Sequence, residues 1–378
     1  MPAPESRLEV LCINGPNLDR LGHRDPSVYG STTLAQLEEK MRVWGDELDI
    51  GVRCLQSSHE GDLVQALNEL EGIDGIVINP GALTHTSRAL HDAVESCGVP
   101  AVEIHISNVR ARERWRRRSL LAPVVVASIF GRGVGGYRAA LSTLSHRRRW
   151  PVEMVRYGPH PDQVVDVRRA AGEQGVAVLV HGGFWLDVWG RDIVEGWAVA
   201  LAEAGISTAC IEYRRLRSGG GGLATVSDAA DAIGLVAWLF GTTPLVVVGH
   251  SAGAHLAVAA ATRASADLSG LVGVGGIYDL ETPDVSGLGG GAVAAFKAWG
   301  GASATTAAPD FPPLALLHGS DDEVVPASQS AAYAEAMTAA GHEVAFHELD
   351  GIAHFDFLDT RSPAWETTRS EVERLFTG

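Results

Sequence analysis

The chain of 378 residues has no long uninterrupted run of apolar residues. Its most apolar stretches, near 123–129 and 245–249, have the length of buried strands and are too short to cross a bilayer. The N-terminus lacks a basic start followed by an apolar core, so a secretory signal is not expected. These absences predict a cytoplasmic protein that does not have a membrane as a partner.

Cysteine is also scarce. The four cysteines are Cys12, Cys54, Cys97 and Cys210, and no two of them form a C-x-x-C pair. Cys12 and Cys210 lie in apolar, strand-like runs, so buried reduced thiols of a cytosolic protein are the simpler interpretation. We expect neither a metal nor a cofactor.

The second part of the chain is short of positive charge. Residues 1–149 carry equal numbers of basic and acidic side chains, so the net charge of −16 falls entirely on residues 150–378. Phosphate neutralisation needs clustered cations, which argues against nucleic acid as a partner. The uneven charge indicates two separately evolved units. One basic run, RARERWRRR at 110–118, is interpreted as a continued helix with a solvated or subunit-contact face.

Short apolar runs alternate with helical patterns over the first 140 residues or so. The runs lie at 10–13, 51–55, 75–78, 101–104 and 124–128. Helical patterns occupy 33–48 and 62–70, among others. This alternation predicts a flavodoxin-like, doubly wound, five-stranded parallel sheet. Ligands of such sheets bind outside the carboxyl ends of the strands, where polar clusters follow the first, third and fourth runs.

A charged break with a proline at 146–151 separates this pattern from a second one. We place the domain limits at 1–147 and 148–378. The second pattern predicts an α/β-hydrolase domain with a mostly parallel eight-stranded sheet. Its strand candidates are 152–156, 163–168, 176–180, 208–212, 245–249, 271–275, 314–318 and 344–348.

Four motifs in the first domain carry chemistry. They are NGPNL at 14–18, GHRDPSVYG at 22–30, NPGALTHTS at 79–87 and EIHISN at 103–108. Dehydration of a β-hydroxy ketone needs a base beside the carbonyl, a group that holds the enolate, and an acid for the departing hydroxyl. A tyrosine can act as the base where a cation favours its phenolate, and Arg24 lies five residues before Tyr29. Glu103 and His105 are two apart in a strand and share one face, so the carboxylate can orient the imidazole.

Together, in this order and spacing, the motifs of about residues 8–143 resemble those of type II 3-dehydroquinases. The resemblance implies conversion of 3-dehydroquinate to 3-dehydroshikimate, with Tyr29 as proton acceptor, Arg24 as its activator and His105 as general acid. Asn14 would hold the water that stabilises the enolate. Asp92 corresponds to an acid that reaches a neighbouring subunit's site, in a family that forms trimers assembled into dodecamers. The residues implied to bind substrate are Asn79, His85, Asp92, Ile106, Ser107 and Arg116.

The second domain contains GHSAG at 249–253, between a strand and a helix, which is the context of a nucleophile elbow. HGGFW at 181–185 follows an earlier strand, and Asp322 and His354 come later in the order of an α/β-hydrolase triad. Ser251 is the candidate nucleophile, and His354 is its base, oriented by Asp322. Asp321 is the adjacent alternative to Asp322.

Backbone N–H groups of Gly183, Phe184 and Ala252 are the candidate oxyanion hole. Residues 152–360 or so resemble hormone-sensitive-lipase and kynurenine-formamidase-like carboxylesterases, which implies hydrolysis of an ester or amide through an acyl-serine. Phe184, Trp185, Trp189 and Tyr213 are candidates for an acyl or aryl pocket, although core packing explains each equally well.

Three hypotheses remain. The first is a bifunctional enzyme, a dehydratase joined to a serine hydrolase. The second is an active dehydratase whose hydrolase-like domain serves assembly or ligand binding. The third is a binding protein on a dehydroquinase scaffold, since fold alone does not establish activity. The presence of Arg24, Tyr29, Glu103 and His105 favours catalysis over binding alone.

Overall fold

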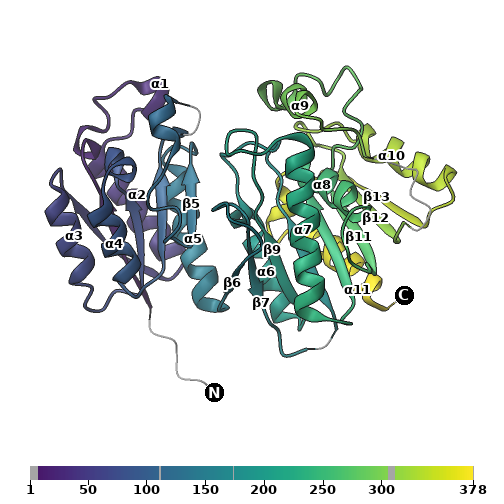
Figure 1. Ribbon diagram of the computed structural model, residues 1–378, viewed down its shortest axis with the longest axis horizontal. Helices are drawn as coiled ribbons and strands as arrows, with labels where there is room; N and C mark the ends of the chain where they lie inside the picture. The colour runs from purple at the N-terminus through teal and green to yellow at the C-terminus, as the bar shows by residue number, and fades with distance from the viewer. Residues whose placement is uncertain (1–6, 110–111, 173, 305–310, 378) are drawn as a thin grey trace. The chain divides into compact units, whose positions relative to one another are not determined.

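The computed structural model describes residues 7–109, 112–172, 174–304 and 311–377. It divides the chain into two compact units, Met1–Arg149 and Trp150–Gly378, each considered by itself (Figure 1). Helix α5 (Gly135–Arg149) continues through most of the segment that the sequence indicated as a break. Its last turn holds Arg147, Arg148 and Arg149, and cations are favourable at the negative end of a helix dipole. The basic cluster therefore ends a helix.

The first unit contains the predicted doubly wound sheet, with five parallel strands in the order β2-β1-β3-β4-β5. The strands are β1 (Leu8–Asn14), β2 (Ile50–Gln56), β3 (Gly75–Asn79), β4 (Ala101–His105) and β5 (Ala127–Phe130). Asn14 is in register with Asn79 across β1 and β3. Both asparagines therefore reach the same carboxyl edge of the sheet.

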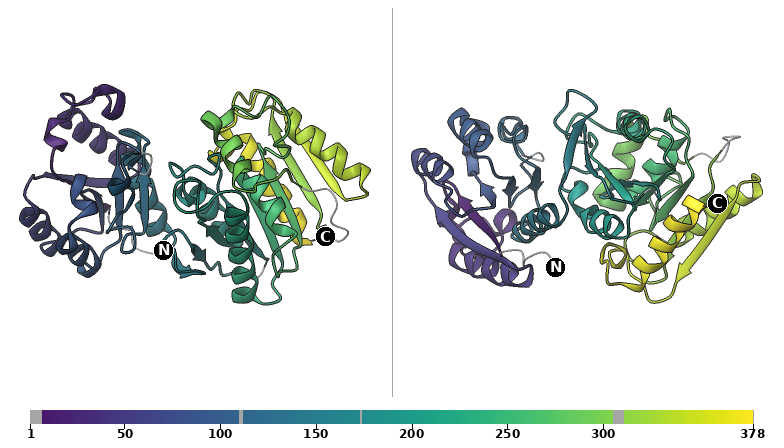
Figure 2. Two further views of the ribbon diagram at one scale, coloured as in Figure 1. Left: turned by 45° about the horizontal axis from the view of Figure 1, so that its top comes forward. Right: turned by 90° about the horizontal axis from the view of Figure 1, so that it is seen from below.

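Helices cover both faces of this sheet, as the views from two further directions show (Figure 2). Helices α2 (Leu34–Glu47) and α5 share one apolar core, and α3 (Glu60–Asn68) and α4 (Arg88–Ser96) share the other. Local sequence sets the start of α2. The Thr33 hydroxyl accepts from the Gln36 backbone N–H, and the Gln36 side chain accepts from the Thr33 N–H. This capping box satisfies two donors that a helix start leaves free.

The prediction of a helix over the basic run 110–118 is wrong for the residues of that run that the structure describes. Residues 110 and 111 lie outside the described residues, and the remainder forms a single 3-10 turn, η4 (Arg114–Arg117). A long helix at a domain surface needs an apolar stripe to bury, and the one large apolar residue of this run, Trp115, is exposed.

The second unit contains an eight-stranded sheet in the order β13-β12-β11-β10-β8-β9-β7-β6. Strand β7 pairs antiparallel with β6 and β9, and the other pairs are parallel, which confirms the mostly parallel prediction. The strands are β6 (Glu153–Arg156), β7 (Val164–Arg168), β8 (Val176–Val180), β9 (Ser207–Ile211), β10 (Leu245–His250), β11 (Gly270–Val274), β12 (Leu314–Gly319) and β13 (Val344–Leu349).

Two sets of helices enclose this sheet. Helices α7 (Gly222–Phe240), α8 (Ala252–Ala261), α9 (Leu288–Ala298) and α10 (Ser328–Ala339) contribute to one core. Helices α6 (Glu195–Glu203) and α11 (Pro363–Thr377) contribute to the other. The core strands β8, β10, β11 and β12 are buried along their whole length, as expected of strands covered on both faces.

Helix α7 is long and apolar enough to span a bilayer by length and composition, contrary to the expectation from uninterrupted apolar runs. No uninterrupted apolar run marks this helix in the sequence, because Asp228 and Asp231 lie within it. In the structure α7 packs against α8, β8 and β9, and Asp228 is buried in hydrogen bonds to Arg214 and Gln163. These contacts are those of a core helix.

Candidate active sites

Most side chains predicted for the first site surround one cavity of about 120 Å³ beyond the carboxyl ends of β3 and β4. Asn14 and Glu103 are fully buried and reach the lining through hydrogen bonds to other side chains. Asp92 lies on the exposed surface of α4 and is not among the lining residues. The predicted residues in the lining are Arg24, Tyr29, Asn79, His85, His105, Ile106, Ser107 and Arg116.

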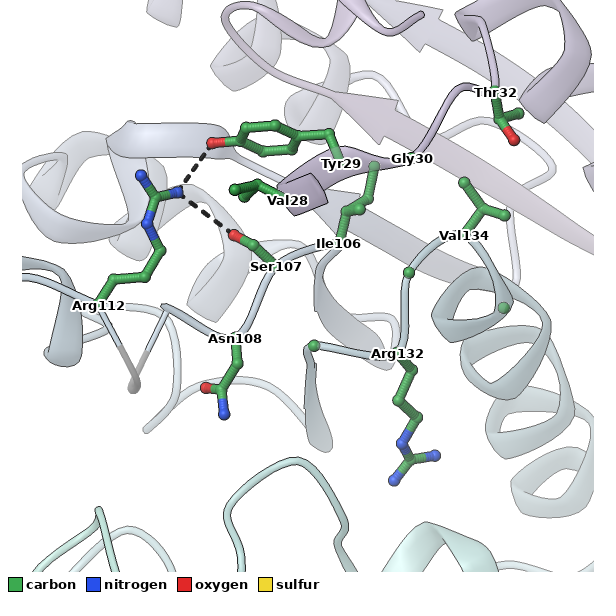
Figure 3. A pocket seen from close by; sticks show the side chains of 13 residues that line it. Val28, Tyr29, Gly30, Thr32, Ile106, Ser107, Asn108, Arg112, Arg132 and Val134 are labelled. Atoms are coloured by element: carbon green, nitrogen blue, oxygen red, sulfur yellow. Dashed lines mark hydrogen bonds between the residues drawn. The ribbon is translucent and has the colours of Figure 1, made fainter. Parts of the chain in front are cut away.

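Two arginines contact Tyr29, and they do so in different ways. The guanidinium carbon of Arg24 lies 3.6 Å from the centroid of the Tyr29 ring, so this cation covers the ring face. Arg112 donates from Nη1 to the Tyr29 hydroxyl at 2.8 Å and approaches the Ser107 hydroxyl at 3.5 Å (Figure 3). The cation at the phenol oxygen is therefore Arg112, which the sequence reasoning left among surface arginines. Its place in a basic run gave little signal.

His105 and Glu103 form a buried pair on β4, as their spacing suggested. Nε2 of His105 lies 2.8 Å from Oε1 of Glu103, which also accepts hydrogen bonds from Thr84 and Ser119. Burial acts to raise the pKa of Glu103, but the hydrogen bonds from His105, Thr84 and Ser119 outweigh it and hold that pKa below its usual range. The carboxylate thus stays charged and orients the imidazole, whose other edge is available to the cavity.

The side chain of Asn14 is held by a series of hydrogen bonds through Tyr137, a residue outside the four motifs. The Tyr137 hydroxyl donates to Oδ1 of Asn14 at 2.7 Å and accepts from Nδ2 of Asn79 at 2.8 Å. Burial raises the pKa of Tyr137 well above its usual value, so this phenol stays protonated and keeps donating. These two hydrogen bonds fix the amide orientation of Asn14 and Asn79 at the adjoining ends of β1 and β3.

His85 and Arg116 also line the cavity. Nδ1 of His85 lies 2.7 Å from the carbonyl oxygen of Arg118, and burial lowers the pKa of His85. Trp115 packs edge-on against His85 with ring centroids 5.3 Å apart, and Arg116 lies over the indole. A second, more open cavity of about 660 Å³ shares Tyr29, Ile106, Ser107 and Arg112 with the first (Figure 3).

The charge on Glu103 predicts a pH dependence of stability. Its folded pKa is below the unfolded value of about 4.3, so its stabilisation is complete above that value and is lost as pH falls through the folded pKa. Hydrogen–deuterium exchange of β4 should therefore accelerate in the wild type as the pH falls from about 6 towards 3, after correction for intrinsic exchange rates. Glu103→Gln should remove this extra acid sensitivity. Glu60→Gln, at an exposed glutamate of α3, should retain it.

Ser251 occupies a strained turn between β10 and α8, with φ 57° and ψ −123°. A non-glycine residue in this region costs of order 1–3 kcal/mol and persists only where its surroundings fix it. Glycines on both sides allow the turn, because a Cβ at Gly249 would lie 2.3 Å from the Gly253 carbonyl oxygen. A Cβ at Gly253 would lie 2.2 Å from the oxygen of Val180. The sequence GHSAG therefore adopts the sharp turn that a nucleophile elbow requires.

His354 and Asp322 are joined by a hydrogen bond of 2.6 Å from Nδ1 to Oδ2. Nε2 of His318 lies 3.1 Å from the same Oδ2, and Oδ1 accepts the backbone N–H groups of Val324 and Val325 at 2.8 Å. Burial opposes the charge on Asp322, but the hydrogen bonds from His318, His354 and Val325 hold its pKa well below the usual range. Asp321, the alternative, is exposed and contacts Ser320.

His250 contacts the backbone of the loop that carries His354. Its Nε2 lies 3.1 Å from the His354 carbonyl oxygen, and burial and the neighbouring His354 lower its pKa to about 3. His250 is thus a neutral structural group. Ser251 and His354 both lie in the described part of the chain, and no hydrogen bond joins them there. The catalytic contact between them remains a prediction, since such bonds often tighten only when substrate binds.

The loop 181–190, here the oxyanion loop, runs beside Ser251, since a Cβ at Gly182 would lie 2.8 Å from the Ser251 Cβ. Gly183, Phe184 and Trp185 have φ values of 108°, 50° and 55°, three left-handed residues in succession. Ala252 begins α8, where a backbone N–H has no acceptor within the helix. The three predicted donors, Gly183, Phe184 and Ala252, thus come from the two segments that flank Ser251.

Two of the aromatic residues proposed for an acyl or aryl pocket belong to the core. Trp185 and Tyr213 are fully buried, and Trp185 stacks on Phe296 with ring centroids 4.0 Å apart. Trp189 is partly exposed and lies 6.3 Å from Phe355, a half-exposed ring adjoining His354.

The fold and first site together define a doubly wound α/β domain with a tyrosine–arginine pair and a histidine–glutamate pair facing one cavity. Residues 8–145 match the family model of class II dehydroquinases. A 3-dehydroquinate dehydratase of Anoxybacillus flavithermus is 50% identical over 138 residues, covering 36% of this chain and 93% of the relative. A catabolic 3-dehydroquinase of Pyricularia oryzae is 46% identical over 147 residues, covering 38% and 94%. Through its first unit, the chain belongs to the class II dehydroquinase family.

The second unit has a structural neighbour in esterase B of Lactobacillus rhamnosis. The two share 18% sequence identity with a TM-score of 0.52, over 60% of this chain and 84% of the esterase. At that identity the likeness shows the α/β-hydrolase fold, as predicted, and leaves the chemistry to the residues at the site.

Proposed function

We propose that the first unit dehydrates 3-dehydroquinate to 3-dehydroshikimate. Tyr29, as phenolate, removes the proton beside the ketone, and Arg112 and Arg24 stabilise the negative charge on its oxygen and ring. Asn14 holds the water that stabilises the enolate. His105, oriented by Glu103, protonates the departing hydroxyl, so one proton is taken, one is given and water leaves. The observation that carries the proposal is that both pairs face one cavity in a domain of this family.

The remaining lining residues suit a hydroxylated carboxylic acid. Backbone N–H groups and the hydroxyl of Ile106 and Ser107 can bind the carboxylate, beside Arg112 and Arg116. Asn79 and His85, which line the same cavity, would bind ring hydroxyls. The test is conversion of 3-dehydroquinate by the purified chain, followed by the rise in enone absorbance. Absence of turnover by a folded chain would contradict the proposal and favour a binding protein.

We further propose a homo-oligomer of trimers that can assemble into a dodecamer, in which Asp92 contributes to a neighbouring subunit's site. Asp92 is exposed on α4 and is not among the residues that line the cavity of its own subunit, which suits that role. Light scattering of the full chain should give a mass that is a multiple of three chains. Asp92→Asn should raise the KM for 3-dehydroquinate, whereas Glu95→Gln on the same helix should not. A monomer with full activity would refute this assembly.

For the second unit we propose a serine hydrolase that cleaves an ester or amide through an acyl-serine. Support comes from the strained turn at Ser251 together with the His354–Asp322 hydrogen bond. His354 would take the Ser251 proton and return it to the leaving group, while the oxyanion loop and Ala252 stabilise the tetrahedral intermediate. The alternative is a non-catalytic module for assembly or ligand binding.

A fluorophosphonate probe separates these two possibilities, because it labels only an activated serine. Wild-type chain should be labelled and Ser251→Ala should not, while Ser320→Ala, at an exposed serine of the same unit, should be labelled like wild type. A screen of short esters and N-formylkynurenine would then identify the substrate class. No labelling of the wild type would favour the non-catalytic module.

A further inference from the structure

The carboxylate of Glu212 forms hydrogen bonds at both ends of the oxyanion loop, residues 181–190. At its start, Nε2 of His181 lies 2.8 Å from Oε1 of Glu212. Just beyond its end, the backbone N–H of Arg191 donates to Oε2 of Glu212 at 3.2 Å. Glu212 follows β9 directly, and its side chain is almost fully buried. Its two oxygens therefore join the two ends of a segment that contains the candidate oxyanion donors.

The residues that follow Glu212 contact the loop along its length. The Tyr213 hydroxyl donates to the His181 carbonyl oxygen at 2.7 Å, and its ring stacks on the His181 imidazole at 4.3 Å. The Leu216 backbone N–H donates to the Trp185 carbonyl oxygen at 2.9 Å. Arg215 donates from its guanidinium to the Trp189 carbonyl oxygen. Segment 212–216 is thus a clamp that holds the oxyanion loop at its start, middle and end.

The carboxylate of Glu212 is itself fixed by charge. Arg215 lies 3.1 Å from its Oε1 and 3.0 Å from Asp162, and Arg191 is paired with Asp166 at 2.7 Å. Burial would raise the pKa of Glu212, but Arg215 and His181 lower it to about 2. The group is therefore an anion at any pH at which an esterase works. Removing one partner of a buried ion pair leaves an uncompensated charge, so Glu212, Arg215 and His181 hold one another in place.

The loop needs such a clamp because of its backbone. Phe184 and Trp185 have left-handed backbone conformations, which residues other than glycine rarely adopt. Such conformations persist only where the surrounding structure enforces them. Hydrogen bonds to the carbonyl oxygens of His181, Trp185 and Trp189 fix the peptide planes around them. The Gly183 N–H shares a peptide plane with the Gly182 carbonyl, whose oxygen lies 2.8 Å from Nδ1 of His181. The Phe184 N–H shares a plane with the Gly183 carbonyl, whose oxygen accepts from the Leu186 backbone N–H at 2.9 Å.

We infer that Glu212 is a positioning residue that pre-organises the oxyanion hole of the second unit by clamping the oxyanion loop at both ends. This inference rests on the proposed hydrolase function. Glu212 does not touch the reacting atoms, and its effect is transmitted through His181 and the backbone of residues 183 and 184. Misplacing such donors weakens binding of the developing oxyanion more than binding of the ground-state ester.

The test uses the full chain and the ester that the wild type hydrolyses fastest. Glu212→Gln keeps the size of the side chain and removes its charge. We expect kcat to fall roughly 100-fold with KM within about twofold, the scale of a misplaced catalytic group. A trifluoromethyl ketone, which forms an oxyanion on a serine, should lose affinity by a similar factor. Glu371→Gln is the matched control, because Glu371 pairs with His347 at 2.9 Å in the same unit without contact to the loop.

Tyr213→Phe provides a second reading if Glu212→Gln does not fold. It removes one hydrogen bond to the loop and keeps the stacked ring, so kcat should fall roughly tenfold, again without a matching rise in KM. Equal losses in kcat for Glu212→Gln and Glu371→Gln, or a change confined to KM, would overturn the inference. Failure of the wild type to be labelled at Ser251 would instead overturn the hydrolase function, which keeps the two failures distinct.

Discussion

Tyr29→Phe is expected to lower dehydratase turnover by roughly 10³- to 10⁴-fold, the upper range for loss of a catalytic acid or base. The substitution removes only the hydroxyl oxygen, which is the proposed proton acceptor and the acceptor of the Arg112 hydrogen bond. The ring remains to pack beneath Arg24, so the fold and the melting temperature should change little. Steady-state kinetics with 3-dehydroquinate, beside thermal unfolding of the same variant, check both statements.

Two further variants make the Tyr29 result specific. Arg112→Gln should lower kcat because the phenolate loses the cation at its oxygen, and Arg24→Gln should do so because the ring face loses its cation. Tyr333→Phe, in the other unit, should leave dehydratase kinetics unchanged. Turnover by Tyr29→Phe within tenfold of the wild type would show that another group removes the proton.

Asp322→Asn is expected to lower hydrolase kcat by roughly 10⁴-fold, as for a triad whose aspartate is replaced by its amide. The structure supplies the reason. Oδ2 of Asp322 accepts from Nδ1 of His354, which leaves Nε2 free to take a proton. An asparagine that presents its amide nitrogen there would favour the opposite tautomer of His354. Fluorophosphonate labelling and ester hydrolysis should fall together, and the unit should remain folded.

Asp321→Asn is the matched control for this prediction. The two aspartates are adjacent, but Asp321 is exposed and bonds only Ser320 among the described side-chain contacts. Its amide should keep full hydrolase activity. Equal losses of hydrolase activity in the two variants would mean that both substitutions act by disturbing the loop that carries the two aspartates. A loss confined to Asp321→Asn would make Asp321 the residue that orients His354. Neither variant should alter dehydration of 3-dehydroquinate.

Much of both folds follows from local sequence. Alternating apolar runs and helical patterns predicted the two sheets, because strands covered on both faces must be continuously apolar. Spacing alone brought Glu103 to His105, since residues two apart on a strand share a face. The polar clusters after the strands predicted where the first cavity would lie, because parallel strands end at one edge. The turn at Ser251 also followed from its small neighbours.

Contacts between distant segments were decided only by the tertiary structure. Arg112 reaches the Tyr29 hydroxyl across 83 positions of sequence, while Arg24, nearer in the chain, covers the ring face. Tyr137 joins Asn14 to Asn79 by hydrogen bonds, although it lies outside the four sequence motifs. The basic run was too poor in apolar residues to continue as a helix, and its function depends on which of its arginines fold back over the cavity.

The sequence by itself determined which groups are the candidates for chemistry in this protein. They are a tyrosine, a histidine–glutamate pair and a serine–aspartate–histidine set, each marked by neighbours within a few residues. The tertiary structure decided what holds those groups in place, through Arg112 at Tyr29, Tyr137 between two asparagines, and Glu212 across the oxyanion loop. The physical reason is the range of the interactions. Turns, caps and strand faces depend on adjacent residues, whereas buried charges and hydrogen-bond chains form only once packing brings distant segments together.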